Sequence, residues 1–290
     1  MGSDQEGFTM AQIVCTIGIT HLPFHYSMAS QPRSQWSPDT EKIVERGEML
    51  REKLRQARAD ALVMIGNDHF HQLFMDNMPA FLLGKMEVFD GIYYNEVREF
   101  NLPRCRVPGD LELAQQILED SMKLGVDFSF SNELKIDHAL VVPLMFVRPE
   151  MDIPIVPILT NCIAPPVPSA ERFFQVGRVL RSVIEKIPGN KRIGVVVSGH
   201  LSLDVGGPLQ FDPRPMNEEF DDKAVSWIAK GDIGTAVREC SFDKLTKIGT
   251  VTPAFMNFLL AMGVSEGLRC TYAEGLKRKG SAQPFFAWEP

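Results

Sequence analysis

Three of the six histidines follow directly on apolar runs that have the length of a buried strand. These histidines are His21, His69 and His200, and the runs before them cover residues 13–20, 61–66 and 192–198. Because ligands bind at the carboxyl ends of the strands in open α/β sheets, we expect the three imidazoles to converge on one site. Imidazole is a ligand of Fe, Zn, Cu and Ni, and two histidines with one carboxylate form non-haem Fe(II) sites. The pattern therefore predicts a mononuclear metal centre.

Further polar residues accompany these histidines. His25 lies four residues after His21, and His71 lies two residues after His69. Such spacings are unspecific in loops, so both residues are equally well explained as supporting residues or as residues without a role in the site. Asp68 either caps the turn after its strand or accepts a hydrogen bond that fixes the tautomer of a ligand imidazole.

The apolar runs that precede these histidines are nearly continuous, as in strands that are buried on both faces. A fourth such run covers residues 153–160. Amphipathic helical stripes cover residues 43–61, 111–118 and 173–187, and a last helix is expected to begin at Thr252-Pro253 with the threonine as its cap. Strands that alternate with helices predict an α/β fold, a single domain with a central, mostly parallel sheet flanked by helices.

The composition narrows the class of protein. Lysine and arginine total 30 against 37 aspartates and glutamates, a net charge of −7, which disfavours binding to nucleic acid or to anionic membranes. No apolar run approaches the roughly 20 residues of a membrane span, and the five scattered cysteines fit neither a disulfide framework nor a zinc knuckle. We expect a cytoplasmic protein. Residues 1–10 are interpreted as an expression remnant or a disordered segment, and residues 11–290 as one catalytic domain.

Four short motifs, taken in order, resemble the class III extradiol ring-cleaving dioxygenases. They are Gly18-Ile19-Thr20-His21-Leu22-Pro23, Asn67-Asp68-His69, Ile136-Asp137-His138-Ala139 with Val142-Pro143-Leu144, and Ser198-Gly199-His200. This family includes the catalytic subunit of protocatechuate 4,5-dioxygenase and dihydroxyphenylpropionate dioxygenase. The resemblance implies that His21 and His69 bind Fe(II), that His200 is the acid/base residue, and that His138 is another catalytic histidine. Mn, Zn or another divalent metal is an alternative to Fe(II).

One position departs from the family pattern. The resemblance places the third metal ligand, a glutamate, at the start of a late helix, where this chain has Ala254. Four candidates remain for that position on the metal: Asn257, Glu218, Glu219 or a water molecule. The loss of an anionic ligand weakens the hold on the metal.

The predicted function is the cleavage of a catecholic or related vicinally oxygenated aromatic ring by O2. A different class of function is a non-oxidative metal-dependent hydrolase or decarboxylase on the same scaffold, and a third is a non-catalytic partner subunit.

Three phenylalanines near the first two histidines are candidates for the pocket wall or for core packing: Phe24, Phe70 and Phe74. The expected partners are a small aromatic substrate, O2 and a second copy of the chain. The second copy is expected because the family that the chain resembles usually associates and because the apolar tail 284–288 is poorly suited to water; packing of the tail within the chain is the alternative. The resemblance also allows a small accessory subunit.

Overall fold

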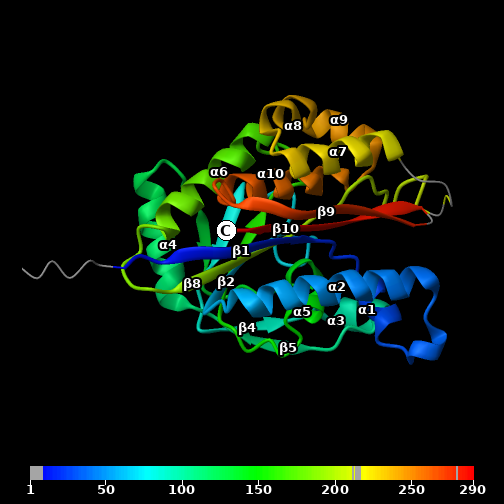
Figure 1. Cartoon of the computed structure of the whole chain (residues 1–290), viewed down its shortest axis with the longest axis horizontal. Helices are drawn as coiled ribbons and strands as arrows, with labels where there is room; N and C mark the ends of the chain where they lie inside the picture. The colour runs from blue at the N-terminus through cyan, green and yellow to red at the C-terminus, as the bar shows by residue number, and fades with distance from the viewer. Residues whose placement is uncertain (1–8, 211, 213–216, 279) are drawn as a thin grey trace, which may run out of the picture.

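The computed structural model describes residues 9–210, 212, 217–278 and 280–290 and centres on one eight-stranded sheet (Figure 1). Its strand order is β6-β3-β7-β2-β8-β1-β10-β9. The strands are β1 (Gln12–Ile19), β2 (Ala61–Asn67), β3 (Phe81–Gly84), β6 (Ser129–Ser131), β7 (Ile155–Thr160), β8 (Arg192–Ser198), β9 (Arg269–Arg278) and β10 (Ser281–Glu289). Two further strands, β4 (Val88–Gly91) and β5 (Cys105–Pro108), form a separate antiparallel pair.

The middle of the sheet consists of the four strands that the sequence predicts. β7, β2, β8 and β1 are neighbours and run parallel. β2 and β7 are buried along their whole length, as expected of strands that are covered on both faces. Parallel pairing brings their carboxyl ends to one edge of the sheet, which is called the carboxyl edge below. The α/β fold with a mostly parallel sheet is therefore confirmed.

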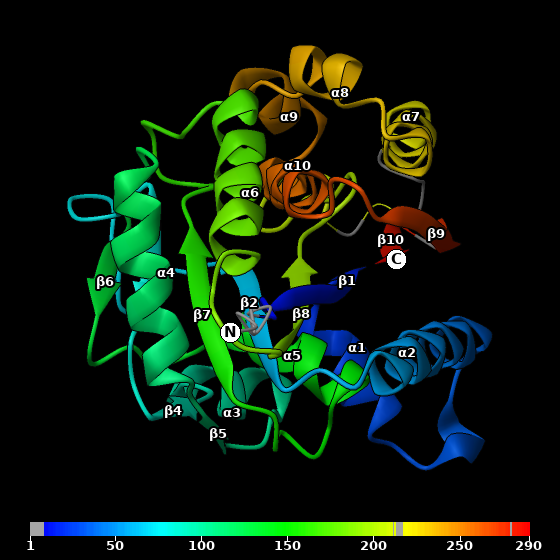
Figure 2. The ribbon, with the colours of Figure 1, turned by 60° about the vertical axis from the view of Figure 1, so that its left-hand side comes forward.

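Helices cover both faces of the sheet (Figure 2). On one face lie α4 (Leu111–Lys123), α6 (Ala170–Ile184) and α10 (Met256–Val264), with α7 (Glu218–Lys230), α8 (Ile233–Glu239) and α9 (Phe242–Ile248) beyond them. The other face carries α1 (Pro23–Ala29), α2 (Pro38–Ala57), α3 (Tyr94–Phe100) and α5 (His138–Val147). Short 3-10 turns are η1 (Arg33–Gln35) and η2 (Thr252–Phe255). Among the described residues, no helix is long and apolar enough to span a membrane.

The three stripes match α2, α4 and α6, but the start of the last helix differs from the prediction. Thr252 opens the 3-10 turn η2, and the α-helix begins only at Met256. The hydroxyl of Thr252 accepts a hydrogen bond from the amide of Leu203, so the threonine does not cap the helix. The predicted remnant covers residues 1–10, of which residues 1–8 lie outside the described residues. Met10, in the same segment, forms an isolated β-bridge with Pro188.

The apolar tail is part of strand β10 of the sheet. The expectation that a monomer would leave this tail exposed to water is therefore wrong. β10 lies between β1 and β9 and is antiparallel to both. Phe285, Phe286 and Ala287 are fully buried there within the chain. A homo-oligomer therefore stays a prediction that rests on the family resemblance alone. All five cysteines are described, and each is a free thiol.

Two glycines let α6 and α10 approach closely. A Cβ atom added at Gly177 would lie 2.2 Å from the carbonyl oxygen of Leu260, and one added at Gly263 would lie 2.3 Å from that of Phe174. We expect Gly177→Ala to lower the free energy of unfolding by about 1–3 kcal/mol through overpacking, as measured by urea denaturation. Gly234→Ala in α8 is the control, because its Cβ meets only Arg238 at 3.5 Å. Equal stability of the Gly177→Ala variant and the wild type would show that the helices do not depend on this contact.

Candidate metal centre

Four histidines from four different elements meet at the carboxyl edge. His21 follows β1, His69 follows β2, His200 follows β8, and His138 is the first residue of α5. The ring centroid of His21 lies 4.1 Å from that of His200, 5.2 Å from that of His69 and 5.7 Å from that of His138. His69 and His138 stack at 4.0 Å. The structure thus brings together all four histidines that the sequence selects.

The strand ends determine where the first imidazole lies. β1 ends at Ile19, and Pro23 opens α1 four residues later, so His21 sits in the short turn between strand and helix. Its Nδ1 atom lies 3.1 Å from the hydroxyl oxygen of Ser198, the last residue of the neighbouring strand β8. This contact occupies Nδ1, so Nε2 is the ring nitrogen of His21 that remains for a ligand.

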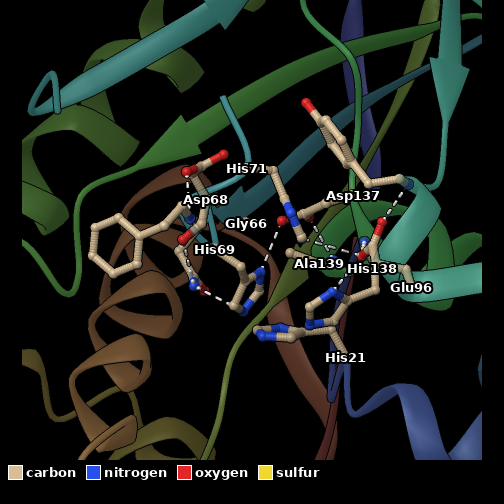
Figure 3. Close-up of polar contacts among 12 residues, drawn as sticks. His21, Gly66, Asp68, His69, His71, Glu96, Asp137, His138 and Ala139 are labelled. Carbon is tan, nitrogen blue, oxygen red and sulfur yellow. Dashed lines mark hydrogen bonds and ion pairs between the residues drawn. The ribbon is translucent and has the colours of Figure 1, made fainter. Parts of the chain in front are cut away.

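Asp137 orients His69. One carboxylate oxygen of Asp137 accepts a hydrogen bond from the amide of Ala139 and caps α5, while the other lies 2.8 Å from Nδ1 of His69 (Figure 3). Asp68 instead accepts a hydrogen bond from the amide of Phe70 at 2.8 Å. Of the two roles considered for Asp68, the structure shows the turn cap.

Glu96 orients His138 in the same way. The glutamate lies in α3, is fully buried and has Oε1 2.6 Å from Nδ1 of His138. The same oxygen accepts a hydrogen bond from the backbone amide of His138, and Oε2 accepts one from the amide of Tyr93. Each carboxylate therefore holds the Nδ1 side of one imidazole. Nε2 of His69 lies 3.3 Å from the side-chain nitrogen of Asn67, and Nε2 of His138 lies on the side of its ring away from Glu96.

The donor atoms fit a metal ion. His21, His69 and His138 each offer one ligand nitrogen, and these nitrogens lie within 4.8 Å of one another. Nε2 of His21 is buried and has no hydrogen-bond partner among the described residues. An unpartnered buried nitrogen is costly unless a ligand satisfies it. Three ring nitrogens this close together make a set of donors that suits Fe, Zn, Cu or Ni.

Burial controls the protonation of these imidazoles. It holds the pKa of His21 and of His138 well below the ordinary value, and the neighbouring histidines act in the same direction. Burial also disfavours the charged form of His69, but Asp137 outweighs it and raises the pKa of His69. Asp137 has a lowered pKa, since His69 outweighs the effect of its burial. A neutral imidazole is the form that binds a metal.

His200 is the fourth imidazole of the site. It is 5% exposed, and burial together with His69 and His138 lowers its pKa to about 3. His200 does not belong to the group of three donors that could hold one ion. A neutral imidazole beside such a group can accept a proton from a bound molecule.

The candidates for the third ligand lie away from the three donors. Glu218 and Glu219 are exposed at the start of α7 and form ion pairs with Lys277 and Lys223, respectively. Ala254 is buried in η2, with its carbonyl oxygen against Gly199. Among the described residues, the group that contains His21 and His69 includes His138 and no carboxylate.

Asn257 has a structural role at the strand ends. Its side-chain oxygen accepts a hydrogen bond from the hydroxyl of Thr160 at 2.7 Å, and its nitrogen donates one to the carbonyl oxygen of Ser198 at 2.9 Å. We expect Asn257→Leu to lower the free energy of unfolding by about 1–3 kcal/mol, because it leaves buried polar groups unpaired. Chemical denaturation and metal analysis should show a less stable protein that still binds its metal. A stable variant that has lost its metal would identify Asn257 as a ligand.

The remaining residues that the sequence selects lie around the site. His25 is buried in α1 against Arg278, and His71 stacks on Tyr93 at 4.4 Å. Phe24 and Phe74 are about half exposed. Phe24 packs on Phe100, whose ring centroid is 6.1 Å from that of His138, so Phe100 is the aromatic neighbour of the site that the sequence analysis missed.

Glu96 is the most important residue that the sequence analysis missed. Its spacing from Tyr93 fits a helix N-terminus in which the glutamate reaches back to the backbone, as the structure shows. That signal predicts a helix start. The contact with His138, 42 residues further along the chain, depends on the fold and has no local sequence pattern.

Comparison with known proteins identifies the family of the chain. Residues 15–279 match the family model described as the catalytic LigB subunit of aromatic ring-opening dioxygenase. A 2,3-dihydroxyphenylpropionate/2,3-dihydroxicinnamic acid 1,2-dioxygenase of Pseudomonas putida is 29% identical over 159 residues, which cover 52% of this chain and 48% of the relative. The corresponding Escherichia coli enzyme is 28% identical over 153 residues, with coverage of 52% and 46%. The chain thus spans about half the length of these curated relatives.

A solved structure supports the fold over nearly the whole chain. The crystal structure of the uncharacterized protein JW3007 from Escherichia coli K12 superposes with a TM-score of 0.63 at 17% identity. The match covers 96% of this chain and 100% of that one. With the family model extending over most of the sequence and the four histidines assembled at the carboxyl edge, the chain belongs to the family of the catalytic LigB subunit of aromatic ring-opening dioxygenases.

Proposed function

We propose that the protein cleaves the ring of a catechol or a related vicinally oxygenated aromatic with O2, at a mononuclear Fe(II) held by His21 and His69. The observation that carries the proposal is the group of imidazole donors within 4.8 Å of one another, with His200 beside it. Mn, Zn and other divalent metals are alternatives, because imidazole binds several of them.

The substrate class is supported by the relatives. The proteins that match about half of this chain are named for two dihydroxylated aromatic acids, and the family model is described as a ring-opening dioxygenase. Adjacent ring oxygens suit a metal that keeps open positions. A bound Fe(II) would supply the one-electron chemistry that lets O2 react with such a ring.

His200 is the proposed acid/base residue. Its neutral imidazole accepts a proton from a substrate hydroxyl and later returns it to an oxygen of the product. His69, with a quarter of its side chain exposed, marks the side from which substrate reaches the site, whereas His21 and His200 are buried. Burial keeps water away from the proton that His200 holds.

The test is oxygen consumption by protein that has been reconstituted with Fe(II) under anaerobic conditions. Catechols, aminophenols and hydroxypyridones form the panel, and resorcinol, whose hydroxyls are not adjacent, is the control substrate. We expect uptake with at least one vicinally substituted ring and none with resorcinol. A metal-loaded protein that consumes no oxygen with any member contradicts the proposal. Hydrolysis or decarboxylation would then be the next activity to measure, because Ala254 stands where the family has a carboxylate.

The proposed partners are the aromatic substrate and O2, with a second copy of the chain and a small accessory subunit as family-based predictions. We further propose that the protein works in the cytoplasm, where free thiols such as those of its five cysteines persist. Neither nucleic acid nor a membrane is a proposed partner.

A further inference from the structure

We propose that His138 is the third protein ligand of the metal, and that Glu96 and Asp137 supply the negative charge that a directly bound carboxylate would otherwise bring. This inference rests on the proposed metal at His21 and His69. It replaces the 2-His-1-carboxylate set of non-haem Fe(II) sites with three imidazoles. His138 then serves as a ligand, and the acid/base role falls to His200 alone.

The geometry directs His138 toward the other two ligands. Its ring stacks on that of His69 at 4.0 Å, and its donor nitrogen belongs to the group that spans 4.8 Å with those of His21 and His69 (Figure 3). Nδ1 of His138 is engaged by Glu96 at 2.6 Å. Nε2, on the opposite side of the ring, is therefore the nitrogen that faces away from the glutamate and can bind the ion.

Glu96 is a buried carboxyl group held in place behind this imidazole. It is fully buried and accepts hydrogen bonds from the backbone amides of Tyr93 and His138 as well as from the ring of His138. A buried carboxylate is costly without such partners. A carboxylate on the far nitrogen of a metal-bound histidine orients the ring and makes its free nitrogen a stronger donor.

Two carboxyl groups stand directly behind the proposed ligands. Three neutral imidazoles bring no charge to a divalent cation, but Glu96 behind His138 and Asp137 behind His69 bring two negative charges. The negative charge that the family places on the metal itself thus sits one hydrogen bond further out. The absence of a carboxylate at Ala254 is then compensated within the described site.

The proposal predicts how many imidazoles bind the ion. Protein loaded with Cu(II) as a probe is examined by pulsed EPR, in which each bound imidazole adds modulation from its remote nitrogen. We expect three imidazoles in the wild type, two in His138→Gln and three in His200→Gln. Circular dichroism establishes that each variant is folded, and the wild-type spectrum decides the number even if a variant does not fold.

Affinity gives a second readout. Competition with a chelator should show that Glu96→Gln binds Zn(II) about 10–100-fold more weakly than the wild type, as expected when the partner of a ligand histidine is lost. Tyr93→Phe is the matched control, because it keeps the backbone amide that Glu96 accepts from. Two imidazoles in the wild type, or a loss of one in His200→Gln, would overturn the proposal. Neither readout needs turnover, so the inference can fail while oxygen uptake succeeds, and the reverse.

Discussion

His200→Gln is expected to lower turnover by about 10²–10⁴-fold, the contribution of a positioned acid/base residue, while the protein keeps its metal. The imidazole lies next to His21, with a ring-centroid distance of 4.1 Å, but is not one of the three donors that could hold an ion. Glutamine retains a polar side chain of similar length but cannot exchange a proton near neutral pH. Steady-state oxygen uptake and metal analysis of the same preparation measure the two effects.

The two other outcomes are equally informative. If the variant binds no metal, His200 is a ligand of the ion, and the proton transfer must be assigned to His138. Turnover close to that of the wild type, with the metal retained, would make His200 a structural residue and contradict the mechanism. A comparison of KM with kcat adds detail, because an acid/base residue acts on the rate more than on binding.

His21→Ala and His69→Ala are expected to abolish stoichiometric metal binding. Each variant loses one of the two donors that follow a central strand and match ligand positions of the family, and Nε2 of His21 is buried without a hydrogen-bond partner among the described residues. The loss should exceed the about 10–100-fold effect of removing an outer hydrogen-bond partner. Metal analysis after reconstitution with Fe(II) and removal of excess ion gives the stoichiometry.

His25→Ala is the matched control for these variants. His25 is also buried, four residues after His21, and its Nδ1 likewise has no hydrogen-bond partner among the described residues. Its Nε2 contacts Arg278, and it does not belong to the group of donors that lie within 4.8 Å of one another. We expect it to retain the metal. If both His21→Ala and His69→Ala bind one equivalent of metal, the ligand assignment is wrong.

The part of the fold that the sequence predicts is the part with a strong local signal. The four central strands are continuous apolar runs because both of their faces are covered, and their ends therefore place His21, His69 and His200 correctly. β10 gives a similar run, but nothing local indicates that it pairs with β1. The sequence therefore does not show whether this run is covered within the chain or by a second copy.

The candidate site could be predicted only as far as its histidines. His138 is recognised through the family motif, yet the helix that it opens contains Pro143 and is buried all round, so no amphipathic stripe marks it. The pairs of His138 with Glu96 and of His69 with Asp137 join residues 42 and 68 positions apart. Contacts of that range follow from the packing of α3 and α5 against the sheet, which no spacing encodes.

A ring-cleaving dioxygenase places both atoms of O2 in the opened aromatic ring. Mass spectrometry can test this on the product that Fe(II)-reconstituted protein forms under ¹⁸O₂ from the most active catechol of the panel. We expect a ring-opened product that carries two ¹⁸O atoms, apart from label lost by exchange with water, and no product when the metal is removed. A product without label, or one formed equally well without O2, would contradict a dioxygenase and assign the histidine site to non-oxidative metal chemistry.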